Sequence, residues 1–452
     1  MTEPEQAKTT SKLLNNLKAA IANGTVEQVR RNLATLHPAE IASLLESTPS
    51  PERELIWELV SPEDEGDVLL HVNDNVRLGL IKAMDPEQLV AATEDMDLDD
   101  LADIIDDLPQ AVTRQVIRSM SDQERVRLKA VLAYPENSAG GLMNPDMVTI
   151  RPDVTLDVVL RYLRLRDELP QHSDSLVVVD RYGRYAGLVY ITDLLLKDPD
   201  TTVDKIMDAS AEPINASMPA PKVAQLFENR DLISAVVVNN ENVVLGRITI
   251  DDVVDVIREE ADHSLMRMAG LDTEEDMFAP VLPAFRRRAM WLGVNLLTAF
   301  LASSVVGAFQ ATIQHVVVLA VLMPIVASMG GIAGTQVLTL MIRSLALGQV
   351  GRSNFRKLLI KEVSIGLLNG LAWAVVLIIS SYIVFDNLVI SLTVGLAMLT
   401  NLFIAACAGM GVPILLRRMK VDPALAGPVI LTTFTDVIGF FSLLGIGTLL
   451  LF

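Results

Sequence analysis

The 452-residue sequence contains a single cysteine, Cys407, so an intrachain disulfide is excluded and the redox compartment is left open. Aromatic residues make up only 5% of the chain, and the five histidines show no metal-ligand spacing. The sequence also lacks a nucleophile–base pair and a phosphate-cradling glycine loop, which argues against an enzyme. The first residues, MTEPEQAKTT, have no hydrophobic core, so we expect no signal peptide and a cytosolic N-terminus.

Acidic residues outnumber basic residues two to one in the first part of the chain. Residues 281–452 hold eleven of the 37 Lys and Arg and four of the 56 acids, a net charge of +7. Residues 1–280 therefore hold 26 basic and 52 acidic residues, a net charge of -26. Such an acidic region repels nucleic acid and attracts cations, and the asymmetry indicates that the two parts meet different solvents. We predict no nucleic-acid partner.

Residues 12 to about 133 have the pattern of short helices. A motif recurs every 24 residues, at 36–40, 60–64 and 84–88, and each copy places a proline beside acidic or amide residues. These are helix-start signals, and their period predicts stacked short helices in a small superhelical array. We assign residues 1–135 to this acidic helical domain.

Within it, residues 94–107 contain eight acids and no base. Asp99 and Asp103 are four residues apart and share one face of a helix, where like charges repel. This face is either a solvated surface or a binding surface for cations.

Two related units follow. Residues 175–180 recur as 234–239, and residues 187–193 recur as 246–252, with the same offset of 59 residues. The pattern of each unit predicts a strand, a turn, a second strand and then a helix that begins at an aspartate. The segment resembles a tandem CBS pair, with units at 136–200 and 201–258. Many CBS pairs bind adenine nucleotides and others serve as scaffolds, so both roles stay open here.

Acidic residues continue into the connecting segment, residues 259–283, which we expect to be largely helical. A helix that joins a sensor to a membrane bundle can transmit motion, or it can be a passive tether. The acids of this region are Asp251, Asp252, Asp255, Glu259, Glu260, Asp262 and four more within 272–276.

The last part of the chain, residues 284–452, predicts five transmembrane helices, because its uncharged runs are long enough to span a bilayer. The runs are 289–308, 311–342, 363–385, 387–416 and 423–435, the last continuing past Asp436. Lys and Arg occur only in alternate connections, which predicts the N-terminus inside and the C-terminus outside. Pro324, Gly330, Gly331 and Gly334 interrupt the second run and indicate either close helix packing or open backbone beside a cavity.

The final run carries one ionisable group, Asp436. A carboxylate near the bilayer centre costs roughly 2.5–3.5 kcal/mol, so such residues face a bundle interior or a wet path. Three threonines at 432, 433 and 435 place hydroxyl oxygens close by, and hard cations such as Mg²⁺ prefer oxygen ligands. We interpret Asp436 as an ion-pathway residue. A protonated aspartate that only joins two helices is the alternative.

The whole pattern resembles the MgtE family of magnesium channels. It combines the helical array, the segment Tyr134–Met143, the CBS pair, an acidic linker and five spans. The membrane motifs agree, and they are Met323–Pro324, Gly330–Gln336, Lys361–Glu362 and Asp422–Leu425, with Asp436 fourteen residues after Asp422. The resemblance implies a multidomain protein with an α-helical superhelical domain, an α/β tandem CBS pair and an all-α membrane domain.

The resemblance also implies a homodimeric Mg²⁺ channel of the bacterial inner membrane, closed by cytosolic Mg²⁺. In that family pattern Asp436 selects the ion in the pore and Asp422 stands at the cytosolic mouth. Regulatory Mg²⁺ would bind between the helical domain and the second CBS unit with its linker. The matching residues are Asp99, Asp103, Asp252, Asp255 and Glu260, with Asp231 as a weaker match.

Two positions depart from the family pattern, because Ile332 and Gln310 stand where Asn and Glu are frequent. The sequence therefore defines the conductance and the ion preference less closely than it defines the fold. Two alternatives stay open: the same architecture conducting Co²⁺ or Ca²⁺, and a membrane-anchored nucleotide sensor that conducts nothing.

Overall fold

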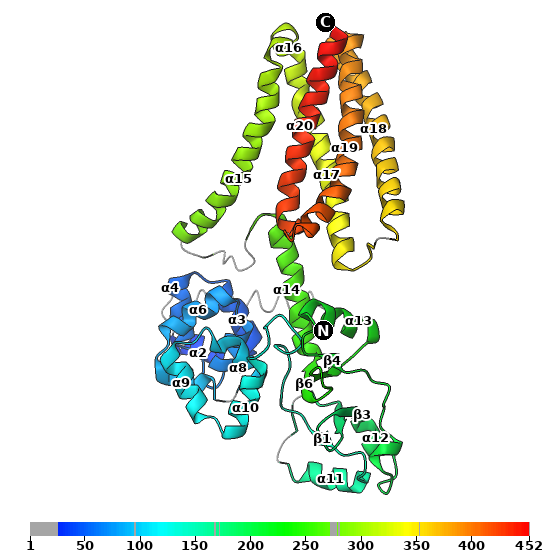
Figure 1. Cartoon of the computed structure of the whole chain (residues 1–452). Coiled ribbons are helices and arrows are strands. Elements are labelled where there is room, and N and C mark those ends of the chain that lie inside the picture. The colour runs from blue at the N-terminus through cyan, green and yellow to red at the C-terminus, as the bar shows by residue number, and fades with distance from the viewer. Residues whose placement is uncertain are drawn as a thin grey trace. The chain divides into compact units, whose positions relative to one another are not determined.

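The computed structural model describes residues 26–94, 96–166, 169–170, 172–271, 278, 281–351 and 353–451. These residues form two compact units: the first contains the described residues up to Ala261 together with Phe278, and the second contains those from Asp262 to Leu271 and from Val281 onward. The first unit contains a domain of short helices and two small α/β domains, and the second contains long apolar helices (Figure 1).

The first domain is built from short helices around one apolar core. Leu45, Val68, Leu69 and Ile104 are fully buried in that core. The helices are α2 (Val26–Leu33), α3 (Pro38–Glu46), α4 (Ser50–Trp57), α5 (Glu65–His71), α6 (Asp74–Ala83), α7 (Pro86–Ala92), α8 (Leu98–Ile105), α9 (Gln110–Ser119) and α10 (Asp122–Val131).

The repeated proline motif begins a helix in two of its three copies. Pro38 is the first residue of α3 and Pro86 is the first residue of α7, and a capping box precedes each helix. In the middle copy, Pro62 lies in a turn and α5 begins only at Glu65. The prediction of a helix start at Pro62 was wrong because proline also suits a turn, where its fixed φ is equally useful.

The two units that resemble a CBS pair each contain a three-stranded sheet, and the two sheets have the same topology. The first has the order β1-β2-β3 and the second β4-β5-β6, each with one parallel and one antiparallel pair. Ser175 pairs with Tyr190 in one sheet, and Ser234 pairs with Thr249 in the other, which keeps the predicted offset of 59 residues. The first unit contains β1 (Thr149–Ile150), α11 (Leu156–Arg164), β2 (Ser175–Val179), β3 (Tyr185–Tyr190), α12 (Ile191–Leu196) and η1 (Val203–Lys205). The second contains β4 (Ile214–Asn215), α13 (Ala220–Arg230), β5 (Ser234–Val238), β6 (Val244–Thr249) and α14 (Ile250–Met268).

Helix α14 is continuous for 19 residues and crosses the predicted domain boundary at 258/259. It ends in a Schellman motif, in which the N–H of Leu271 donates to the carbonyl of Met266 at 3.0 Å. Gly270 adopts φ +71° there, the left-handed conformation that this motif requires. The four acids at 272–276, which the sequence assigns to the connecting segment, lie outside the described residues.

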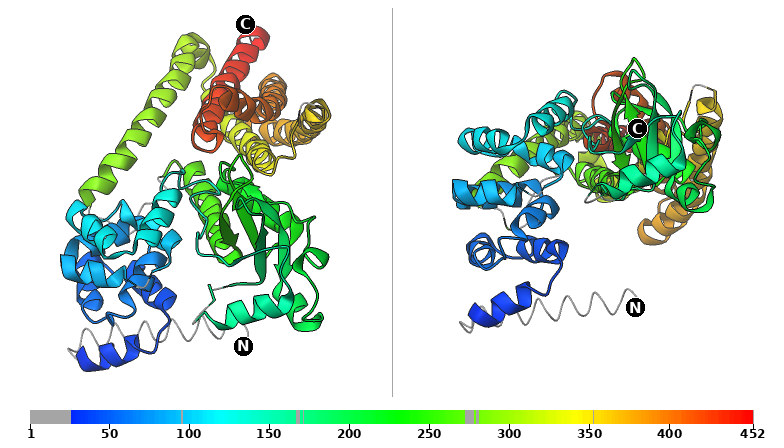
Figure 2. Two further views of the ribbon diagram at one scale, coloured as in Figure 1. Left: turned by 60° about the horizontal axis from the view of Figure 1, so that its bottom comes forward. Right: turned by 90° about the horizontal axis from the view of Figure 1, so that it is seen from below.

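The second unit contains five helices that are long and apolar enough to cross a membrane, as the sequence predicts. Helix α19 packs against α17, α18 and α20, and α15 contacts α20 but diverges from it toward the start of α15 (Figures 1 and 2). The long helices are α15 (Val281–Ala308), α17 (Val318–Ala346), α18 (Phe355–Phe385), α19 (Leu388–Arg418) and α20 (Pro423–Leu451), and the short α16 (Gln310–His315) joins the first two.

The proline and glycines of the second span do not interrupt its helix, since α17 runs from Val318 to Ala346. A Cβ on Gly330 would lie 2.1 Å from the amide nitrogen of Asn401, and one on Gly334 would lie 3.1 Å from Leu431. These two glycines therefore permit close helix packing, one of the two predicted roles. Gly331 lies on the other side, at a cavity.

Candidate functional site

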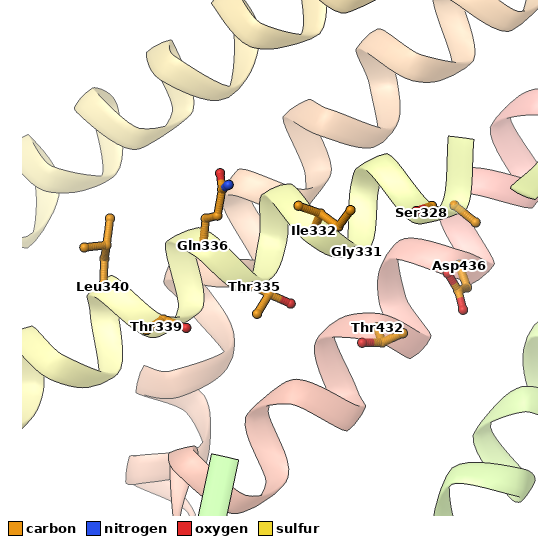
Figure 3. A pocket seen from close by; sticks show the side chains of 10 residues that line it. Ser328, Gly331, Ile332, Thr335, Gln336, Thr339, Leu340, Thr432 and Asp436 are labelled. Carbon is orange, nitrogen blue, oxygen red and sulfur yellow. The ribbon is translucent and has the colours of Figure 1, made fainter. Parts of the chain in front are cut away.

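Asp436 lies half-buried on α20 and lines a cavity of about 850 Å³ between α20 and α17. Figure 3 shows Asp436 and Thr432 of α20 beside residues of α17. The α17 residues of the wall are Ala327, Ser328, Gly331, Ile332, Thr335, Gln336, Thr339 and Leu340. Asp436 is the sole ionisable side chain among the lining residues. The cavity is therefore an apolar space with several hydroxyls and one carboxylate.

The three threonines near Asp436 point in different directions. Thr432 shares the cavity with Asp436, whereas Thr435 is fully buried in the bundle. Their hydroxyls donate to backbone carbonyls of the same helix, at 2.9 Å from Thr432 to Pro428 and 3.0 Å from Thr435 to Thr432. Each hydroxyl oxygen keeps lone pairs as an acceptor. Of the three, Thr432 lines this cavity with the carboxylate, while Thr433 lines a second, smaller pocket with Asp436.

Asp422 lies directly before α20, which begins at Pro423. Its Oδ1 accepts the N–H of Ala424 at 2.8 Å, so it caps the helix that carries Asp436. Its Oδ2 accepts Nη1 of Arg267 at 3.0 Å. At 1.5 Å of rise per residue, the fourteen residues from Asp422 to Asp436 span about 21 Å of helix.

A second group of acids gathers at the N-terminal end of α8. Carboxylate oxygens of Asp97, Asp99 and Asp100 lie within 4.8 Å of one another. The positive end of the helix dipole favours negative charge at this place, although three carboxylates repel each other. The Oδ1 atom of Asp99 is buried and has no hydrogen-bond partner among the described residues. A buried acceptor of this kind is costly unless a ligand or water satisfies it.

The pKa values of this acidic group are raised. Burial, followed by the charges of Asp100 and Asp97, raises the pKa of Asp99 to about 7. Burial and the charge of Asp97 do the same to Asp100, whose pKa is also about 7. Asp103 has an exposed side chain overall, but protein around its carboxyl displaces water and, together with Glu136 and Asp99, raises its pKa to about 7. A bound cation would relieve this repulsion.

Asp252 joins the acidic group from the start of α14. Burial and then the charge of Asp99 raise its pKa to about 7, despite hydrogen bonds from Thr249 that act the other way. Both the N–H and the hydroxyl of Thr249 donate to Asp252 Oδ2 at 3.2 Å. One oxygen thus caps α14 while the carboxylate faces the acids of α8. We call Asp97, Asp99, Asp100, Asp103 and Asp252 the acidic cluster.

The remaining acids proposed from the sequence lie differently. Asp255 and Glu260 are exposed on α14, Asp255 one turn beyond Asp252. Asp231 ends α13 in a left-handed conformation with φ 51°. Sequence reasoning omitted Asp97 and Asp100, although the signal was present, because Asp97 precedes the apolar periodicity of α8 as an N-cap should.

The acidic cluster offers carboxylate oxygens alone, which is the donor set that Mg²⁺ and Ca²⁺ prefer. Oδ1 of Asp99, which is buried and has no hydrogen-bond partner in the described part of the chain, fits a divalent cation, and so does the mutual repulsion of its neighbours. Asp97, Asp99 and Asp100 would hold it, with Asp252 from α14.

These features define a multi-pass membrane protein that combines an acidic helical domain and a tandem pair of small α/β domains with a bundle of long apolar helices, in which one carboxylate lines a cavity. Residues 36–137 match the MgtE intracellular N domain, residues 139–200 and 203–259 match the CBS domain, and residues 323–446 match the MgtE divalent cation transporter.

Two curated relatives are similar over almost their entire length. The magnesium transporter MgtE of Thermus thermophilus is 30% identical over 449 residues, covering 97% of this chain and 99% of the relative. The magnesium transporter MgtE of Bacillus subtilis is 26% identical over 443 residues, covering 98% of each. A solved structure of the cytosolic domain of the Mg²⁺ channel MgtE in complex with ATP is 28% identical, with a TM-score of 0.49, over 54% of this chain and 99% of that one.

The chain therefore belongs to the MgtE family, whose members are magnesium transporters or channels and not enzymes.

Proposed function

We propose that this chain is a Mg²⁺-selective channel of the bacterial plasma (inner) membrane that works as a homodimer. Its N-terminus would lie in the cytosol and its C-terminus outside. The observation that carries the proposal is Asp436, the one ionisable side chain among the described residues that line a cavity of about 850 Å³ between α17 and α20. A carboxylate in a membrane helix is expensive and is typical of an ion path.

One carboxylate per chain is too few to select Mg²⁺, and this argues for two copies around the path. A two-fold axis would present Asp436 twice, since an isologous interface repeats each residue. Mg²⁺ dehydrates reluctantly and keeps several waters. The pair would therefore hold a largely hydrated ion through water, while Thr432 offers a further acceptor oxygen on the same wall.

Closure would follow from Mg²⁺ binding at the acidic cluster. The four carboxyls with pKa values of about 7 repel one another when they are charged. Cytosolic Mg²⁺ would hold α8 against the start of α14, with Asp255, Glu260 and Asp231 as further ligands. A regulatory ion closes the path only if it binds the closed form more tightly. Loss of Mg²⁺ would let the like charges separate the domains.

The domain boundaries predicted from the sequence, including the connecting segment at 259–283, stay part of this proposal, with its first ten residues continuing helix α14. Adenine nucleotide binding at the CBS pair is likewise proposed, on the match of residues 139–200 and 203–259 to CBS domains. Nucleotide titration of the purified chain, followed by calorimetry, tests it.

Mg²⁺ uptake by the full chain, purified and reconstituted into proteoliposomes, tests the proposed function. A Mg²⁺ gradient should drive uptake, reported by a trapped Mg²⁺ dye, and uptake should persist with excess Ca²⁺ or Co²⁺ outside. If excess Ca²⁺ or Co²⁺ abolishes Mg²⁺ uptake instead, the result would favour a pathway for that ion. Tight nucleotide binding without flux of any of the three ions would favour the non-conducting sensor.

A further inference from the structure

An ion pair joins the end of α14 to the start of α20. Nη1 of Arg267 donates to Oδ2 of Asp422 at 3.0 Å, across 155 positions of sequence. The two side chains are 43% and 33% exposed, so water only partly screens the pair. The other oxygen of Asp422 caps α20 through the N–H of Ala424. A movement of Arg267 therefore acts directly on the first turn of α20.

A second contact fixes the same end of α14. Gly270 completes the Schellman motif and lies against the indole of Trp291 on α15. A Cβ on Gly270 would lie 1.9 Å from the indole nitrogen, so only glycine fits this approach. The last turn of α14 thus contacts α15 through Gly270 and reaches α20 through Arg267.

This end of α14 also forms part of a pocket that reaches Asp436. The pocket has a volume of about 340 Å³, and Met268 and Ala269 lie in its wall. Asn295 and Thr298 of α15 line it with Thr432, Thr433 and Asp436 of α20. Asp436 therefore borders two cavities, and the last turn of α14 helps to enclose the second one.

We propose that Arg267 is a positioning residue that latches α14 to the mouth of the ion path through Asp422. This inference deepens the proposed function and rests on it. While the pair is formed, the guanidinium neutralises Asp422 and holds Met268 and Ala269 in the wall of the second pocket. Release of Arg267 frees the Asp422 carboxylate to meet an incoming hydrated Mg²⁺. The latch thus ties closure to the loss of an acid from the mouth.

Patch recording of the full chain tests the latch with Arg267→Gln. Loss of a partly exposed pair should raise the Mg²⁺ concentration for half-maximal closure by about two- to fivefold. Arg267→Lys keeps the charge and should restore most of the wild-type value, and the exposed Arg118→Gln should leave it unchanged. Asp422→Asn, which keeps a capping oxygen, should shift closure as Arg267→Gln does, and the double variant should shift it no further.

A readout that needs no current separates the latch from the function. In a Cys407→Ser background, Met268→Cys should react with a maleimide several-fold faster once Arg267→Gln is added, at saturating Mg²⁺. An unchanged labelling rate, or shifts from Arg267→Gln and Asp422→Asn that add independently, would overturn the latch. A wild-type chain that passes no Mg²⁺ would instead refute the proposed function, and the labelling comparison would still decide the latch.

Discussion

Asn401 Nδ2 donates to the backbone carbonyl of Val326 at 2.8 Å, and this bond joins α19 to α17 within the bundle that carries Asp436. Asn401 is fully buried, and Gly330 and Gly439 lie against its amide. Its Oδ1 has no hydrogen-bond partner among the described residues. The amide therefore joins α19 to α17 through this hydrogen bond. It also packs against α20 at Gly439, three residues after Asp436.

Replacing Asn401 with alanine should destabilise the membrane bundle. The change removes a buried hydrogen bond and leaves a void between two glycines, which together cost about 1–3 kcal/mol. The melting temperature of the chain in detergent should fall by several degrees. Thr400→Ala, at an exposed neighbouring position whose hydroxyl bonds only its own helix, serves as the control. Equal melting temperatures for both variants would contradict the account of Asn401.

Replacing Ile332 with asparagine should increase Mg²⁺ flux. Ile332 is 56% exposed on the wall of the cavity that contains Asp436. An amide there supplies an acceptor for the waters that a hydrated Mg²⁺ keeps. Uptake into proteoliposomes should rise severalfold, whereas Leu371→Asn on the exposed face of α18 should change nothing. An unaltered rate in Ile332→Asn would mean that this wall does not limit the passage of the ion.

Neutralising Asp252 and Asp255 together should leave the channel open at millimolar Mg²⁺. The double Asn variant removes the charge of Asp252 from the acidic cluster and that of Asp255 one turn beyond it, so Mg²⁺ no longer favours the closed form. Patch recordings should show Mg²⁺ inhibition weakened by about tenfold or more, on the order of 1.4 kcal/mol of lost differential binding. Asp200→Asn with Asp204→Asn makes the same change in charge at exposed positions and is the matched control. Equal inhibition in both would remove the cluster from gating.

The stabilisation of the chain by Mg²⁺ should grow with pH. The cluster carboxyls have pKa values of about 7 in the folded chain against 3.8 normally. A raised pKa means that protons stabilise the folded state fully below about pH 4, and that this contribution is lost as the pH rises through 7. At pH 8 the carboxylates of the cluster are therefore charged and repel one another, and bound Mg²⁺ relieves this repulsion. At pH 5.5 the carboxyls are protonated, so little repulsion is left for Mg²⁺ to relieve.

Calorimetry of the full chain at the two pH values checks this. The rise in melting temperature on adding Mg²⁺ should be large at pH 8 and small at pH 5.5. The difference should shrink when Asp99→Asn and Asp252→Asn are combined, because fewer carboxyls then compete for a proton or an ion. A rise that is independent of pH would show that these carboxyls do not bind the ion.

The sequence predicts the elements of this fold well because local patterns encode them. Uncharged runs gave the five spans, and the offset of 59 residues gave the two CBS sheets with matching register. Proline and acid motifs predicted the start of α3 and α7 but not that of α5, since Pro62 serves a turn. Where a signal has two physical uses, the surrounding chain decides between them.

The candidate site was less predictable because its contacts join distant parts of the chain. Periodicity selected Asp99 and Asp103 but could not show that Asp100 belongs with them and with Asp252. The pairing of Arg267 with Asp422 and the contact of Asn401 with Val326 depend on how helices pack, which no local pattern states. Asp436 stood out because its chemical cost in a membrane is visible in one segment.

The most direct test of the central claim is Mg²⁺ uptake by Asp436→Asn in proteoliposomes, at matched protein density and with the wild type and Asp386→Asn beside it. Asp386 is exposed and left-handed in the connection between α18 and α19, a conformation that asparagine tolerates, so its variant controls for the loss of one acid. The account predicts that Asp436→Asn loses nearly all uptake while Asp386→Asn keeps it. Wild-type uptake in correctly folded Asp436→Asn would contradict it.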